Sequence, residues 1–176
     1  MKFILKPDDS TPPLLLETLQ YQAMWQAHGQ AIRKAFRKVT GLEFQQSVIT
    51  ARVYNGAQSD AGANGKAMRL AGDNRPPGYK LATIVHELSH RLLGGNALNT
   101  TSLGLGGEHK YTDEVSEVDH RHVYLMEYDV LHAALGNEGE EIFRQYEQLW
   151  RRDPDSPHEK ALLWVLSLSY EQRQAV

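Results

Sequence analysis

The chain contains no cysteine among its 176 residues. This absence excludes disulfide bonds, thiolate metal ligands and a cysteine nucleophile, so any metal site must use His, Asp or Glu. The sequence also lacks an apolar run of the roughly 18 residues that a membrane-spanning helix needs. The apolar run within Met1–Pro7 is too short for a signal peptide. We therefore expect a cytoplasmic protein with no membrane partner.

The sequence also lacks an excess of positive charge. It has 19 Lys and Arg against 22 Asp and Glu, a net charge of −3, which argues against nucleic acid as a partner. Apolar residues make up 41% and charged residues 23%, which is ordinary for a globular protein. From this length we expect residues 1–176 to form a single domain.

The hydrophobic pattern predicts a mostly helical α+β fold. Alternation of apolar and polar residues predicts three short strands, at Lys2–Lys6, Ser47–Tyr54 and Lys66–Leu70. Helical periodicity predicts five helices, at Leu14–Val39, Tyr79–Leu93, Asp113–Leu135, Glu138–Arg151 and Glu159–Leu168. We expect the small β-sheet to pack beside the Tyr79–Leu93 helix.

The strongest motif is the H-E-x-x-H string formed by His86, Glu87 and His90. On a helix, residues four apart lie on one face, so both imidazoles can bind the same Zn²⁺. The apolar residues of this helix lie on the other side, and we expect both histidines to face outward into a cleft. Glu87 can then act as the general base that takes a proton from the zinc-activated water.

The third ligand is not fixed by spacing. A metzincin would have a histidine at position 96, where this chain has Asn96, so that class is excluded. The candidates on the Asp113–Leu135 helix and in the loop before it are Glu117, Asp119, His120, His122 and His109. Glu117 and His120 share one helical face with Tyr124, whereas His122 points elsewhere.

These motifs resemble a group of small, uncharacterised bacterial and phage proteins assigned as zinc metallopeptidases. The similar stretches are Val85–Leu93, Asp119–Arg121, Tyr124–Leu125, Tyr128–Val130 and Leu163–Ser169. The resemblance implies a zincin-like fold and His120 as the third ligand. The residues themselves leave Glu117 as the main alternative. The chain departs from the group in its long insertion at Asn96–Thr112 and at Met126 and Glu127, where the group is mostly apolar.

Further residues have supporting roles in this hypothesis. Asp129 or Asp119 could accept a hydrogen bond from a zinc-bound histidine. A tyrosine could stabilise the developing oxyanion, with Tyr124, Tyr128 and Tyr54 as candidates. Either of the strands Ser47–Tyr54 and Lys66–Leu70 could pair with an extended peptide.

The sequence thus predicts a zinc-dependent metallopeptidase that hydrolyses a peptide or protein substrate. Zn²⁺ would be held by His86, His90 and His120, with Glu87 as the catalytic residue. The alternative is a zincin-like module that binds a protein partner and uses the metal for structure or regulation. Because structural zinc sites are closed by four protein ligands, the number of ligands distinguishes the two hypotheses.

Overall fold

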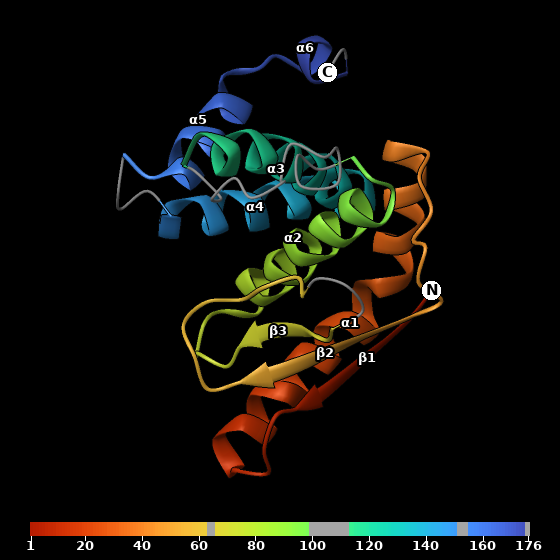
Figure 1. Cartoon of the computed structure of the whole chain (residues 1–176), viewed down its shortest axis with the longest axis vertical. Coiled ribbons are helices and arrows are strands. Elements are labelled where there is room, and N and C mark those ends of the chain that lie inside the picture. Colours follow the sequence, from red (N-terminus) through yellow and green to blue (C-terminus); the bar gives the residue numbers. More distant parts are fainter. Residues whose placement is uncertain (63–65, 99–112, 151–154, 175–176) are drawn as a thin grey trace.

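The computed structural model describes residues 1–62, 66–98, 113–150 and 155–174. Its strands are β1 (Lys2–Pro7), β2 (Val48–Tyr54) and β3 (Met68–Ala71). Its helices are α1 (Pro12–Thr40), α2 (Pro77–Gly95), α3 (Asp113–Leu135), α4 (Asn137–Trp150), α5 (Pro157–Ser167) and α6 (Tyr170–Gln174) (Figure 1). The predicted mostly helical α+β class with a small sheet is confirmed. No helix among the described residues is long and apolar enough to cross a membrane.

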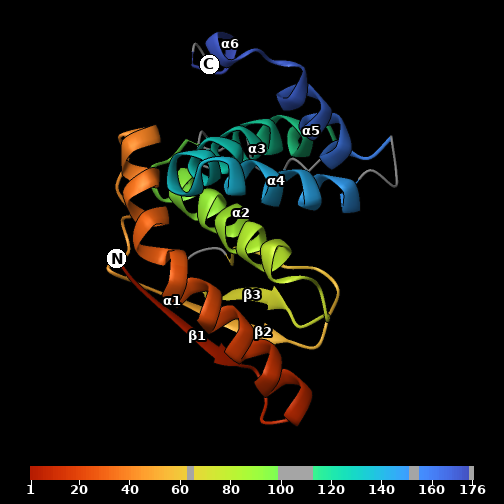
Figure 2. The same cartoon turned by 180° about the vertical axis from the view of Figure 1, so that it is seen from behind.

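The three strands form a parallel sheet in the order β1-β2-β3. Parallel neighbours need a long crossover, and α1 supplies it between β1 and β2. Along β2 the side chains of Ile49, Ala51 and Val53 are buried while Arg52 between them is exposed. The helices α1 and α2 cover the side of the sheet that faces the viewer in Figure 2, and no described helix lies on the other side, which faces the viewer in Figure 1.

Helix α2 lies at the centre of the molecule, in contact with α1, α3, α4 and β3. Pro77 and Gly78 open it, in keeping with the preference of proline for the first turn. Its apolar residues Leu81, Ile84, Val85, Leu88 and Leu92 are fully buried. His86 and His90 line a pocket on the opposite face, as expected of a cleft, but His86 is only 5% exposed because α3 and α4 pack against that face.

Several element boundaries differ from the sequence prediction. Strand β2 begins at Val48, and β3 runs from Met68 to Ala71 and leaves Lys66 outside. Helix α6 was not predicted. Helices α1 and α3 are followed by Gly41 and Gly136, and both glycines have the positive φ that ends a helix, 67° and 62°.

Trp25 and Trp164 are half-buried and pack against the core from its border. The side chain of Trp150 and the loop residues 99–112, which include His109, lie outside the described part of the chain.

Candidate metal centre

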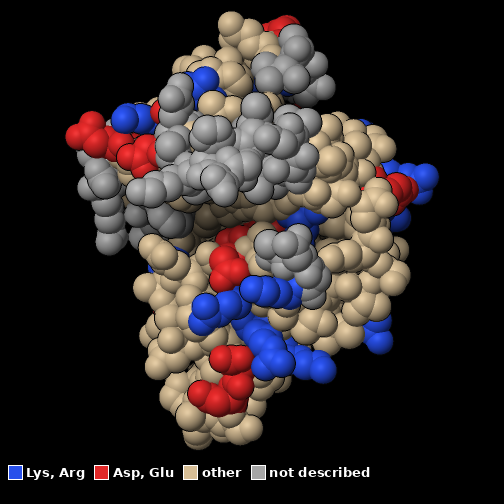
Figure 3. All heavy atoms as spheres, viewed as in Figure 1, with Lys and Arg blue, Asp and Glu red and all other residues tan. Residues whose placement is uncertain are grey.

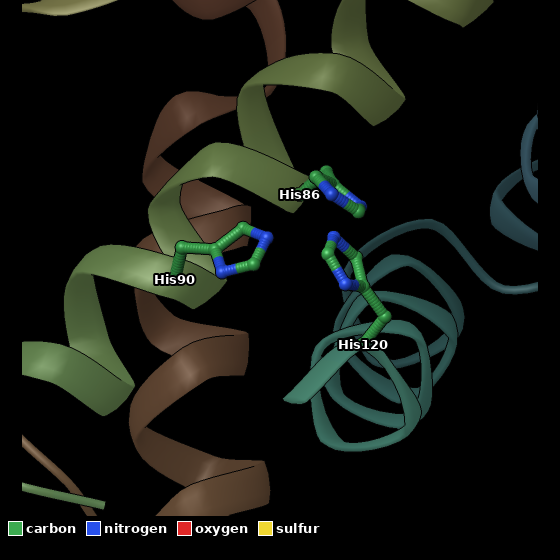
Figure 4. Close-up of side chains that lie close together, drawn as sticks. All are labelled: His86, His90 and His120. Carbon is green, nitrogen blue, oxygen red and sulfur yellow. The ribbon is translucent and has the colours of Figure 1, made fainter. Parts of the chain in front are cut away.

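Helices α2 and α3 bring three histidines together. His86 and His90 lie one turn apart on α2, and His120 projects from α3 toward them, so that the three rings converge between the helices (Figure 4). Each imidazole offers one nitrogen that lies within 4.8 Å of those of the other two. The ring centroids are 5.0 Å apart for His86 and His90, 5.7 Å for His86 and His120, and 4.9 Å for His90 and His120. This group could bind a metal ion.

Hydrogen bonds at Nδ1 orient two of the three rings. Nδ1 of His86 lies 3.0 Å from Oε2 of Glu127, and Nδ1 of His120 lies 2.7 Å from the carbonyl oxygen of Ser116. The Ser116 carbonyl only accepts hydrogen bonds, so Nδ1 of His120 carries the proton, and Nδ1 of His86 carries it when the Glu127 carboxyl is ionised. The lone pair is then on Nε2, and this is the arrangement that metal-binding histidines usually have.

Burial keeps the imidazoles in the neutral form that binds metals. It lowers the pKa of His86 well below its ordinary value, and the neighbouring His90 and His120 lower it further. The pKa of His90 falls to about 3 for the same reasons, and burial also lowers the pKa of His120. A proton therefore competes weakly with a cation for these nitrogens.

The three histidines line a pocket of about 390 Å³ together with Glu87. Glu87 is buried, and this burial, with a contribution from Asp60, raises the pKa of its carboxyl to about 8. Burial, with a contribution from Glu87, also raises the pKa of Glu127 well above its ordinary value. Two buried carboxylates beside three neutral imidazoles fit a cation, whose charge would offset the cost of burying them.

Three residues of this site were missed from the sequence. Glu127 is fully buried and forms a hydrogen bond with His86. It lies seven residues after His120 on the same helical face, and this spacing could have indicated it. His158 of α5 lines the pocket, and its ring centroid is 3.8 Å from that of His120. Tyr146 of α4 also lines it. No local pattern connects α4 and α5 to the motif, so His158 and Tyr146 gave no signal.

Other candidate ligands lie apart from the triad. Glu117 forms an ion pair with Arg121 on the next turn of α3, with 2.6 Å between Oε1 and Nη2. His122 is exposed and borders a different pocket. Asp119 is buried but does not belong to the group that could hold a metal among the described residues.

The supporting residues also differ from the prediction. The carboxylate that contacts His86 is Glu127, whereas Asp129 lies 4.0 Å from Arg173. The hydroxyl of Tyr54 donates to the carbonyl of Gln58. Tyr128 packs against Phe143, His132 and Arg173, outside the metal pocket. Tyr124 reaches the site through its hydroxyl, which lies 3.3 Å from Nδ1 of His158.

The predicted strand for peptide pairing needs a correction as well. Strand β2 is central and paired on both sides, so it offers no free edge. Strand β3 is at the edge, but the backbone N–H and carbonyl of its Arg69 already bond those of Asp60, both at 2.9 Å. The segment around Asp60, rather than β3 itself, borders the metal pocket.

Comparison of the chain with protein-family models, with curated proteins and with solved structures found no match.

Proposed function

We propose that the protein is a zinc-dependent metallopeptidase, with Zn²⁺ held by His86, His90 and His120. The observation that carries this proposal is the placement of Glu87 in the same pocket as three convergent imidazoles. Imidazole also suits copper, iron and nickel, but three neutral histidines beside a carboxylate match the composition of catalytic zinc sites. The helix that carries H-E-x-x-H packs beside a sheet, which supports a zincin-like fold.

The residues of the chain have separate roles in this mechanism. Zinc at such a site lowers the pKa of water and polarises a carbonyl group. Glu127 and the Ser116 carbonyl hold the rings of His86 and His120 in the orientation that presents Nε2. Glu87 takes a proton from the attacking water and gives it to the amine nitrogen that leaves.

His158 is the best-placed group to stabilise the negative charge that develops on the substrate carbonyl oxygen. It lines the pocket next to His120, and Tyr124 lies within hydrogen-bonding distance of its Nδ1. When Nδ1 accepts a hydrogen bond from the Tyr124 hydroxyl, Nε2 carries the imidazole hydrogen and can donate a hydrogen bond to that oxygen. Tyr124, which the sequence predicted for this task, would then act through His158.

Metal content and cleavage test the proposal together. We expect about one zinc per chain after reconstitution, retained in His122→Ala and lost in His86→Ala, His90→Ala and His120→Ala. Glu87→Gln should keep the zinc and lose peptide cleavage by about 10²–10⁴-fold.

Glu117→Gln is the matched control for Glu87→Gln, because it removes a carboxylate that is paired on α3 away from the triad. Its zinc content and cleavage should equal those of the wild type. A wild-type chain that takes up no zinc, or a Glu87→Gln chain that cleaves as well as the wild type, contradicts the proposal.

The proximity of His158 to His120 also supports a second candidate, a zincin-like module that binds a protein with a structural metal. In that case His158 would be a fourth ligand and the site would be closed. X-ray absorption spectroscopy of the zinc-loaded protein distinguishes the two. Four imidazoles in the wild type and three in His158→Ala would support the module, whereas three in both support the enzyme.

A further inference from the structure

The open face of the sheet carries a row of positive charge. The strand register pairs Lys6 of β1 with Arg52 of β2, and Arg52 with Arg69 of β3. All three side chains are exposed, on the face that α1 and α2 leave uncovered. Neighbouring strands are about 4.8 Å apart, so the three cations are direct neighbours across the sheet.

Such a row is unfavourable on its own, because like charges directly opposite each other destabilise a sheet. Two contacts offset part of this cost. Nη1 of Arg52 lies 3.2 Å from Oδ1 of Asp8, and the Arg69 guanidinium lies 3.9 Å from the centre of the Tyr54 ring. Neither contact removes the positive charge from Arg69 or Lys6. A local basic face on a chain of net charge −3 calls for an anionic partner.

The row continues into a groove of about 500 Å³ at the β3 edge. Three cations and two carboxylates line this groove: Arg52, Lys66 and Arg69, with Asp8 and Asp60. Figure 3 shows the Lys and Arg side chains gathered over the sheet, with acidic side chains at the upper and lower borders of the cluster.

The basic groove is connected to the metal pocket. Asp60 lines both, so the two hollows share a wall. Arg91, one residue after the ligand His90, donates from its guanidinium to the carbonyls of Ala61 and Lys66. These bonds tie the rim of the groove to α2. An extended chain that leaves the metal pocket over Asp60 therefore enters the basic groove.

We propose that this groove binds acidic side chains of the substrate, so that the enzyme prefers peptides with Asp or Glu a few residues from the cleaved bond. The inference rests on the metallopeptidase function proposed above. Asp8 and Asp60 favour a peptide over a nucleic acid, because they repel a continuous phosphate backbone but leave room for separate carboxylates between the cations.

Peptide binding tests the groove without turnover. The protein is zinc-loaded Glu87→Gln, and fluorescence anisotropy gives Kd for a labelled octapeptide with three consecutive glutamates and for its glutamine counterpart. We expect the glutamate peptide to bind at least about tenfold more tightly in low salt, with the difference shrinking as salt screens the charges. Equal affinity for the two peptides overturns the proposal.

Variants locate the binding. Arg52→Gln combined with Arg69→Gln should weaken binding of the glutamate peptide about tenfold and leave the glutamine peptide unchanged. The matched control is Lys34→Gln combined with Lys160→Gln, which removes two exposed cations from α1 and α5. It should not change the binding of either peptide. Arg52→Lys with Arg69→Lys should keep the preference. Equal weakening by the control pair, or none by the groove pair, overturns the proposal.

Three further outcomes test the ligand and separate this inference from the proposed function. A single-stranded oligonucleotide that binds the groove more tightly than the glutamate peptide would replace the peptide as ligand and overturn the proposal. If the glutamate preference is found while wild-type zinc protein cleaves no peptide of an acidic library, the groove is supported and the peptidase function fails. Cleavage of neutral and acidic peptides with equal kcat/KM supports the peptidase and contradicts the groove.

Discussion

Replacing Glu127 tests how far the metal centre depends on a residue that does not itself bind the metal. Its Oε2 lies 3.0 Å from Nδ1 of His86, and both side chains are buried. A buried hydrogen bond to a charged group contributes about 1.5–3 kcal/mol, and losing the partner of a metal-bound histidine typically costs 10–100-fold in affinity, or about 1.4–2.7 kcal/mol. We expect Glu127→Ala to weaken zinc binding about 100-fold. Glu127→Gln, which keeps an acceptor but no charge, should weaken it about tenfold.

Zinc affinity is measured by competition with a chromophoric chelator, and thermal unfolding of the zinc-free variants separates a metal effect from a folding defect. Glu117→Gln is the control, because Glu117 is a carboxylate of the same helix that is paired with Arg121 instead of a histidine. An unchanged affinity in Glu127→Ala, while His86→Ala loses zinc, would refute the reasoning. The same conclusion would follow if Glu117→Gln weakened binding as much as Glu127→Gln.

Three further predictions concern packing and the pocket. Lys80 is fully buried with its Nζ 2.6 Å from Oε2 of Glu17, so Lys80→Met should lower the free energy of unfolding in urea by about 3–5 kcal/mol. Lys80→Met combined with Glu17→Met should lower the free energy of unfolding by less than Lys80→Met alone. A Cβ at Gly139 would lie 2.1 Å from a backbone carbonyl oxygen of α3, so Gly139→Ala should lower the free energy of unfolding by at least about 1–3 kcal/mol. The control is Gly95→Ala, whose Cβ would have its nearest contact at 3.5 Å and should not destabilise the fold. His158→Ala should keep one zinc per chain and lose about 10²-fold in kcat; loss of the zinc would contradict an open site.

The helices could be predicted from the sequence where local chemistry decides. Helix α3 has the predicted bounds, Asp113–Leu135, because Gly136 takes a positive φ that other residues avoid. Periodicity was less informative about which residues are buried. Leu15 and Leu19 fit an apolar stripe on α1, yet they are 41% and 61% exposed while Ile32 and Phe36 are buried. A stripe shows that one face is apolar, but the neighbouring elements determine how much of it is covered.

The candidate site likewise has one part that follows from the sequence and another that depends on how the helices pack. His86 and His90 are related by one helical turn, so their shared face follows from the sequence alone. His120 comes 30 residues after His90 on another helix, and only the packing of α2 on α3 brings it to them. Glu127 stands where the group that the sequence resembles is mostly apolar, and its hydrogen bond with His86 gives a physical reason for a carboxyl group there. A carboxylate on a buried helical face needs a partner, and the partner indicates its role.

The number of protein ligands decides between an enzyme and a structural site, and the present geometry favours an open position. Among the described residues, the histidines whose ligand atoms lie within 4.8 Å of one another are three and do not include His158. Nδ1 of His158 lies within hydrogen-bonding distance of the Tyr124 hydroxyl, so this nitrogen already has a partner. A zinc ion with three histidine ligands keeps its fourth position for water, and here that position would lie in a pocket lined by Glu87. A structural site needs neither this pocket nor a buried carboxylate beside it, whereas hydrolysis needs both.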